Sequence, residues 1–229
     1  MNVSNKRTLH VFSLERVSYE NALELQRHLA QMRIQGKVDD LLLLLEHPPV
    51  ITLGRGHKAD HLLVDQEFLK EQGILFFEIE RGGDITYHGP GQLIGYPILD
   101  LNFQGRDIHR YVRMLEEVLI RTLEAFDITA KRLAGLTGVW VEKQKIASIG
   151  VHIRRWVTWH GFALNVDMDL SFFDLIAPCG IDGVKMTSMA HIKGKEISLS
   201  EVTEKTVGFF AEVFDLEAQK NPFGLWPIF

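Results

Sequence analysis

The longest amphipathic pattern in the chain runs from Ile108 to Phe126. Its apolar side chains recur at helical spacing and form one stripe, and Asp107 stands where an N-cap would satisfy the first backbone amides. This pattern predicts a long helix that covers one face of a sheet. An earlier stripe predicts another amphipathic helix that ends before Gly36. That earlier stripe consists of Ala22, Leu25, Leu29 and Met32.

Capping signals indicate two further helices. Asp65 is suited to cap a short helix that Gly73 would stop. Near the C-terminus, Ser198 and Glu201 have the spacing of a capping box, in which the two residues satisfy backbone amides reciprocally. This spacing predicts a helix that continues to about Phe214.

Short apolar runs without helical spacing predict strands. These runs are Leu41–Leu45, Val50–Leu53, Leu75–Ile79, Leu93–Leu99, Gly138–Val141, Ile146–Ile153 and Val157–Val166. No low-complexity linker and no repeat at solenoid spacing divides the chain. The order of strands, helix, strands and helix predicts a single α+β (mixed α/β) domain over residues 1–229.

Composition and charge restrict the class of protein. The chain has 229 residues, of which 46% are hydrophobic and 24% charged, as in a soluble globular protein. A formal charge of −5 offers no general attraction to nucleic acid or acidic lipid, so neither is expected as a partner. The longest aliphatic run, Leu41–Leu45, is far shorter than the roughly 20 residues that span a bilayer. With no export signal and one cysteine, the sequence predicts a cytoplasmic protein.

Cys179 is the only cysteine, so it has no partner for an internal disulfide. A lone cysteine is often an inert, buried apolar residue. This one lies between Pro178 and Gly180, in a stretch whose prolines and glycines favour a turn. A turn leaves a thiol near backbone amides, and this context favours a reactive cysteine whose thiolate acts as a nucleophile.

Lys145 begins a predicted strand upstream of that turn. Taken alone, a lysine in such a position is usually a solvated surface charge. A thiol has an ordinary pKa of about 8.5, and a nearby ammonium group would lower it. Lys145 is therefore a candidate for the cation that stabilises the thiolate of Cys179.

A third motif, Arg81–Gln92, holds four glycines among polar residues. We expect it to be a loop between two strands, because it is too polar for a simple hairpin turn. Glycines allow a backbone to approach a ligand closely, and exposed amides can bind an oxyanion or carbonyl oxygen. A purely structural turn is the alternative, and His88 could equally be a hydrogen-bonding residue behind the ligand.

Two other patterns are weaker. Gly54–Ala59 matches a dinucleotide-binding fingerprint after a strand, but no convincing helix follows it. His57 and His61 have the spacing of metal ligands, yet the sequence offers no further ligand cluster, so an exposed pair is the simpler interpretation. We predict no metal site.

Three motifs together carry a family resemblance: Arg81–Gln92, Lys145–Gly150 and Pro178–Ile181. In content, order and spacing they closely resemble the octanoyl-[acyl-carrier-protein]:protein N-octanoyltransferases of lipoate biosynthesis, and the resemblance spans most of the chain. It implies a catalytic domain like those of the biotin and lipoate protein ligases, in which helices flank a mixed β-sheet.

The resemblance also implies roles for matched positions. Cys179 would carry the octanoyl group as a thioester, and Lys145 would lower its pKa and move protons in both half-reactions. The small residues Gly161 and Ala163 would leave room for the acyl chain. The implied substrate-binding residues are Arg81, Gly82, Gly83, Asp84, Ile85, Thr86, Tyr87, His88, Ser148, Ile149, Gly150, Gly161, Phe162 and Ala163.

The implied donor is octanoyl-acyl carrier protein. The implied acceptors are the lipoyl domains of 2-oxoacid dehydrogenase complexes and the glycine cleavage H protein, each modified on one lysine. Exchange of one thioester for another needs no ATP, so no cofactor is expected. An ATP-dependent lipoate protein ligase of the same fold is the nearest alternative, but Cys179 argues against it. A noncatalytic acyl-binding or carrier-binding module is disfavoured by the presence of both Cys179 and Lys145.

Overall fold

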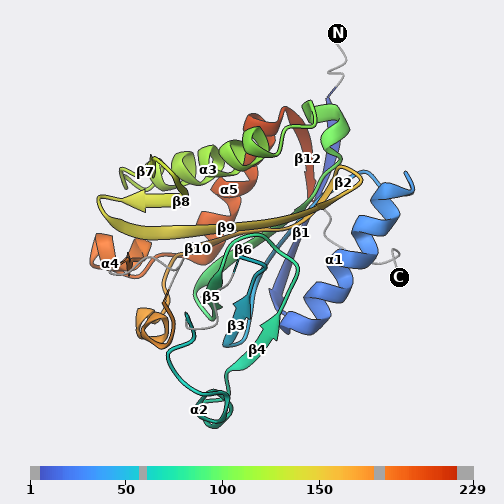
Figure 1. Cartoon of the computed structure of the whole chain (residues 1–229). Coiled ribbons are helices and arrows are strands. Elements are labelled where there is room, and N and C mark those ends of the chain that lie inside the picture. Colours follow the sequence, from blue (N-terminus) through green and yellow to red (C-terminus); the bar gives the residue numbers. More distant parts are fainter. Residues whose placement is uncertain (1–5, 57–60, 178–183, 221–229) are drawn as a thin grey trace.

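A computed structural model describes residues 6–56, 61–177 and 184–220. Its centre is a mixed sheet, twisted across the molecule, with strand order β12-β1-β2-β6-β10-β9-β8-β7; a short strand, β11, pairs with β9 (Figure 1). The strands are β1 (Arg7–Arg16), β2 (Asp40–Glu46), β6 (Gln92–Ile98), β7 (Lys131–Leu133), β8 (Leu136–Val141), β9 (Gln144–Arg154), β10 (Val157–Asn165), β11 (Lys185–Met186) and β12 (Leu216–Lys220).

Three long helices cover the two faces of this sheet. α3 (Ile108–Glu124) and α5 (Leu199–Phe214) lie together on one face, and α1 (Tyr19–Ile34) lies on the other (Figure 1). The larger apolar cluster joins α3 and α5 to the sheet, and a second cluster joins α1 to it. Central strands such as β2 and β10 are buried along almost their whole length because helices cover both of their faces.

A smaller, three-stranded sheet stands beside the main one. It consists of β4 (Leu75–Glu78), β3 (Val50–Leu53) and β5 (Ile85–His88), with β3 in the centre. The short α2 (Gln66–Glu71) and the 3₁₀ helix η3 (Leu170–Leu175) contribute to its own apolar cluster. This sheet positions the glycine-rich stretch that precedes β5.

The predicted helices are confirmed, together with their caps. The side chains of Asp107 and Asp65 accept the amides of Arg110 and Phe68, at 2.9 and 2.8 Å. Ser198 accepts the amide of Glu201 at 3.4 Å. The helix that was expected to continue to Phe126 ends at Glu124.

The predicted strands are also confirmed as β2, β3, β4, β6, β8, β9 and β10, with ends shifted by a few residues. The expectation of a loop throughout Arg81–Gln92 is wrong for its central part, because Ile85–His88 forms β5 and pairs with β3 in antiparallel register. Pairing with β3 satisfies the backbone here, so only the flanking residues have loop structure. Strands β1, β7, β11 and β12 and the short helices α4 (Met189–Lys193) and η2 (Leu101–Gln104) were not predicted.

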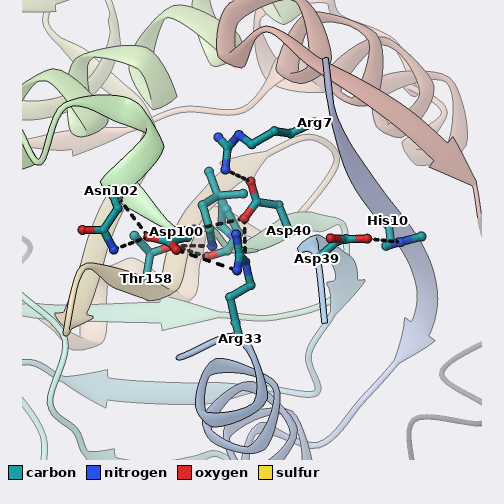
Figure 2. A network of polar contacts seen from close by, with 10 residues as sticks. Arg7, His10, Arg33, Asp39, Asp40, Asp100, Asn102 and Thr158 are labelled. Carbon is teal, nitrogen blue, oxygen red and sulfur yellow. Dashed lines mark hydrogen bonds and ion pairs between the residues drawn. The ribbon is translucent and has the colours of Figure 1, made fainter. Parts of the chain in front are cut away.

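A buried ionic network ties several elements together where β2 begins. Asp40 of β2 is 1% exposed at its side chain and binds Arg7 of β1 at 2.7 Å and Arg33 of α1 at 2.9 Å. Its Oδ1 also accepts the backbone amide of Asp100, at 3.0 Å. Asp100 in turn lies 3.7 Å from Arg33 and caps η2 through the amide of Asn102 (Figure 2). One carboxylate thus links β1, α1, β2 and the start of η2.

No helix in the described part of the chain is long and apolar enough to cross a membrane.

Candidate active site

A cavity of about 330 Å³ opens between the small sheet and strands β8, β9 and β10 of the main sheet. Its wall mixes apolar side chains with buried polar ones. The lining residues are Tyr19, Gly56, Arg81, Gly83, Asp84, Ile85, Thr86, His88, Tyr96, Gly135, Leu136, Thr137, Trp140, Lys145, Ser148, Ile149, Gly150, His160, Gly161, Phe162 and Ala163. The cavity therefore collects residues from widely separated parts of the chain.

Lys145 lies in this wall, close to the start of β9, and is only 4% exposed. Its Nζ is 5.4 Å from the centre of the Trp140 ring, which is the residue directly opposite on β8. Its carbonyl oxygen accepts the amide of Thr187 at 2.9 Å, and Met186 of β11 pairs with it in register. The backbone of Lys145 is therefore held by strands on both sides.

Hydrogen bonds to β3 and β9 hold the glycine-rich stretch in place. The guanidinium of Arg81 donates to the carbonyl and the hydroxyl of Thr52, at 2.8 and 2.9 Å. Gly82 donates its amide to the carbonyl of Val151 at 2.9 Å, which attaches the stretch to β9. A Cβ added at Gly150 would lie 2.8 Å from the Gly82 carbonyl oxygen, so only glycine permits this approach.

A chain of buried amides leads from the cavity to the backbone beside Lys145. His88 Nδ1 lies 2.8 Å from Gln92 Oε1, and the Gln92 amide nitrogen donates to Asn165 Oδ1 at 2.9 Å. Asn165 donates to the carbonyl of Thr187 at 2.9 Å, and the amide of Thr187 donates to Lys145. The His88-Gly-Pro-Gly-Gln92 sequence is thus connected to the lysine by hydrogen bonds.

The buried histidines of this region are held as neutral rings. Burial and, to a smaller extent, the nearby His47 lower the pKa of His88 to about 3. Burial also lowers the pKa of His160 to about 3, against an opposing effect from Glu80. Burial likewise raises the pKa of Tyr96 well above its ordinary range. At neutral pH these groups therefore do not exchange protons readily.

Most of the predicted site residues meet at this cavity. Lys145 and all but two of the predicted substrate-binding residues line it. The exceptions are Gly82, whose amide bonds to β9, and Tyr87, whose ring packs against Phe172 at 4.9 Å in the small apolar cluster. Alternation along β5 turns Tyr87 to the face opposite Thr86 and His88, which line the cavity.

Cys179 lies outside the described residues, and so does His57. The described chain on either side of the Cys179 segment is anchored near the cavity. Before it, Ala177 donates its amide to the carbonyl of His61 at 2.8 Å. His61 Nδ1 lies 2.5 Å from a carboxylate oxygen of Asp84 in the cavity wall. After it, Lys185 and Met186 form β11 beside Gln144 and Lys145.

The sequence did not indicate several residues of the cavity wall, chiefly Tyr19, Tyr96, Trp140 and His160. Only His160 carried a usable signal, as a histidine inside the apolar run Val157–Val166. The backbone amide of His160 donates to the side chain of Gln26 at 2.8 Å, and the φ of His160 is 55°. Among the described residues, no group of three or more His, Cys, Asp or Glu is placed to hold a metal ion.

Comparison with known proteins shows close relatives. The chain is 55% identical over 204 residues to the octanoyltransferase of Solibacter usitatus, covering 89% of this chain and 92% of that protein. It is 45% identical over 212 residues to the octanoyltransferase of Desulforamulus reducens, covering 92% and 93% of the two chains.

Solved structures share the fold at low sequence identity. Lipoate-protein ligase A bound with ATP has a TM-score of 0.76 and 18% identity, with 93% of this chain and 88% of that chain covered. A structure from an archaeal lipoylation system, described as a bipartite lipoate protein ligase and its E2 lipoyl domain from Thermoplasma acidophilum, has a TM-score of 0.72 and 18% identity, with 94% and 86% covered. The model of the lipoyl protein ligase A/B catalytic domain matches residues 18–211. The predicted fold and family are thus confirmed: this acyltransferase belongs to the lipoyl protein ligase A/B catalytic domain family, in which its close relatives are octanoyltransferases.

Proposed function

We propose that this enzyme transfers an octanoyl group from octanoyl-acyl carrier protein to one lysine of a lipoyl domain, through a thioester on Cys179. The observation that carries the proposal is the burial of Lys145 in the cavity wall, beside β11, the strand that follows the Cys179 segment in the sequence. A lysine that is 4% exposed is not a solvated surface charge. The lipoyl domains of 2-oxoacid dehydrogenase complexes and the glycine cleavage H protein are the proposed acceptors.

The first half-reaction loads the enzyme. The Cys179 thiolate attacks the carbonyl carbon of the carrier thioester, so a new carbon–sulfur bond forms and the bond to the carrier sulfur breaks. The Lys145 ammonium first stabilises the thiolate and then gives its proton to the departing carrier thiolate. One thioester replaces another, so the step requires no ATP.

The second half-reaction transfers the octanoyl group from Cys179 to the lipoyl-domain lysine. Lys145, now neutral, takes a proton from the ammonium of the incoming lipoyl-domain lysine, which has an ordinary pKa of about 10.4. The resulting amine attacks the acyl carbon and the bond from that carbon to the Cys179 sulfur breaks. The nitrogen releases its second proton to solvent as the amide forms, and the Cys179 thiolate is regenerated. His88 and His160 are poor candidates for this base, because burial keeps the pKa of each at about 3.

The cavity suits an apolar acyl chain. Ile85, Leu136, Ile149, Phe162 and Ala163 supply apolar wall, and each buried methylene contributes about 0.8 kcal/mol to binding. A Cβ added at Gly161 would lie 2.2 Å from the Gly95 carbonyl oxygen, so glycine is needed there for the approach of β6 to β10. Octanoyl donors should therefore react faster than acetyl donors, and equal turnover of the two would count against an acyl site here.

Rapid quenching tests the covalent intermediate. The enzyme is mixed with octanoyl-acyl carrier protein, without a lipoyl domain, quenched, and measured by intact mass spectrometry. We expect an octanoyl adduct that hydroxylamine removes and that Cys179→Ala lacks. Absence of an adduct on the wild-type enzyme would refute the thioester mechanism. Lipoyl-domain octanoylation from free octanoate and ATP, with none from the carrier thioester, would instead support a ligase.

A further inference from the structure

Glu116 of α3 is a carboxylate with no exposed surface, and the proposed mechanism gives it no role. One of its oxygens accepts hydrogen bonds from Arg113 and Arg132, at 2.6 and 3.0 Å. The other accepts the backbone amide of Gly138 at 3.1 Å. Glu116 therefore joins α3 to β8, the strand that faces Lys145.

Gly138 occupies an unusual place in β8. Its φ is 120°, a backbone conformation that residues with side chains rarely adopt. The pairing of β8 with β9 shifts register beside it, so that Val139 pairs with Ala147 but Trp140 pairs with Lys145. A carboxylate thus receives the amide of Gly138 next to an irregularity in the ladder.

The side chain of Lys145 packs directly over this glycine. A Cβ added at Gly138 would lie 2.6 Å from Lys145 Cε and 3.3 Å from Lys145 Nζ. It would also lie 2.6 Å from the carbonyl oxygen of Ala147. The bare backbone of Gly138 is therefore one surface of the space that holds the lysine, and the Trp140 ring is another.

Packing alone does not explain a carboxylate at position 116. Burying a charge is costly, and apolar residues of similar volume often replace buried ion pairs without loss of stability. A methionine would fill the space between α3 and β8, but it would leave the buried amide of Gly138 without an acceptor. Arg113 and Arg132 have side chains that are 52% and 34% exposed and can reach water instead, so the amide of Gly138 is the partner that depends on the carboxylate.

We propose that Glu116 is a positioning residue for Lys145: by binding the amide of Gly138 it fixes the surface against which the lysine packs, and so directs the ammonium group into the cavity. The proposal depends on the role given to Lys145 in the proposed function. Misplacement of a reacting group by about 1 Å can cost on the order of a hundredfold in rate. A small shift of Gly138, and with it of Lys145, is therefore enough to lower the rate of transfer.

The test compares three variants. Glu116→Met removes the acceptor and the charge at similar volume, whereas Glu116→Gln keeps an oxygen that can accept from Gly138. Glu117→Met is the matched control, because Glu117 is the next residue on α3 and its carboxylate binds Arg121 and Arg132 at 2.9 and 2.8 Å. This control removes an arginine clamp on β7 and leaves the bond to Gly138 in place.

Each variant is measured in three ways. Steady-state transfer from octanoyl-acyl carrier protein to a lipoyl domain gives kcat and KM. Alkylation of Cys179 by iodoacetamide across a range of pH gives the thiolate fraction without any substrate, because the chain has one cysteine. Thermal unfolding reports stability. If Glu116→Met does not fold, Glu116→Gln still tests the proposal, because it keeps the acceptor for Gly138 and should keep part of the transfer rate.

For Glu116→Met we expect kcat to fall by roughly ten- to a hundredfold with little change in KM. The alkylation profile should move to higher pH, because the ammonium no longer faces the thiol. Glu116→Gln should recover part of both properties, and Glu117→Met should keep both at the wild-type level.

Two results would overturn the proposal. One is a Glu116→Met enzyme that unfolds earlier but keeps the wild-type kcat and alkylation profile or, if that variant does not fold, a folded Glu116→Gln enzyme that loses as much kcat as Lys145→Met. The other is a Glu117→Met enzyme with the same kinetic defect, since that would assign the effect to the arginine clamp. Failure of the proposed function itself looks different: Lys145→Met would then leave the alkylation profile unchanged.

Discussion

Two regions of the molecule bury ionisable side chains, and they do so in opposite ways. Around Asp40, two guanidinium groups and one backbone amide surround a single carboxylate within 2.7–3.0 Å. Around the cavity, His88, His160 and Lys145 are as deeply buried, but they face an open volume of about 330 Å³. Partners fill the first region, and the second is left with room for a substrate.

The two regions also lie at different ends of the central strands. β10 begins at Val157, which bridges to Asp100 of the ionic network, whereas Lys145 stands near the opposite end of the β9–β10 hairpin. Burial raises the pKa of Asp40, and this effect is opposed by Arg7, the backbone amide of Asp100 and Arg33. We infer that the network stabilises the fold, whereas the proposed function gives the cavity residues a role in catalysis.

Replacement of Lys145 should produce the largest effect on transfer. Lys145→Met keeps a side chain of similar length but removes the acid and base, so kcat should fall by about 10²- to 10⁴-fold. The free energy of unfolding should stay the same or increase, because a buried charge is removed. Steady-state kinetics and urea unfolding measure the two quantities.

The matched control is Lys145→Arg, which keeps a charge but cannot readily act as a base. It should also be defective. Normal transfer by this variant would show that Lys145 supplies only electrostatic stabilisation. Normal transfer by Lys145→Met would show that Lys145, like Asp40, has no role in catalysis.

Replacement of Asp40 should produce the reverse pattern. Asp40→Asn leaves Arg7 and Arg33 near each other without their shared counter-charge, and breaking a buried pair in this way typically costs about 3–5 kcal/mol. Urea unfolding should detect the loss, while kcat per folded molecule should be unchanged below the unfolding transition. A selective fall in kcat, with wild-type stability, would mean that the network acts on the cavity.

Acid should weaken the fold through the cavity histidines. The pKa of His160 is lowered from 6.5 to about 3, so below pH 6.5 the unfolded chain binds a proton that the folded chain refuses. Stability should therefore fall as the pH drops from 6.5 towards 3, by about 1.4 kcal/mol per pH unit for each such imidazole.

His160→Asn isolates one histidine, because asparagine does not titrate and tolerates the positive φ at this position. The stability lost between pH 6.5 and pH 5 should be about 2 kcal/mol smaller in this variant than in the wild-type protein. Urea unfolding at the two values measures the difference. Equal losses in the two proteins would show that His160 is not held neutral in the folded state.

The sequence predicted the parts of the fold that depend on local patterns. The stripe before Phe126 and the cap at Asp107 correspond to α3, and the apolar run Val157–Val166 corresponds to β10. β1 and β12 escaped prediction because polar residues interrupt their apolar positions; β12 is the edge strand of the sheet and β1 is its neighbour. β5 escaped because its pairing with β3 is a long-range property.

The site was predictable where a motif carried it and not where tertiary contacts did. The glycine-rich stretch and Lys145 were indicated by family resemblance, and both line the cavity. Tyr19 and Tyr96 belong to a helix and a strand whose apolar patterns explain them fully without any site. Glu116 lies on the buried stripe of α3, where only the contact with Gly138 shows what it does.

The smallest predicted effect separates stability from catalysis in both regions. Gly208 lies on the exposed side of α5, and an added Cβ would meet no atom within 4 Å. Gly208→Ala should stabilise the protein by about 1 kcal/mol, because glycine is a poor helix former. Combined with Asp40→Asn, Gly208→Ala should restore that amount of stability, since the sites share no contact. Combined with Asp40→Asn or with Lys145→Met, it should leave the kcat of the single variant unchanged.

If Gly208→Ala instead restored a lost kcat in Asp40→Asn, that loss came from partial unfolding. If it restored transfer to Lys145→Met, the lysine would be another structural residue and the comparison would fail.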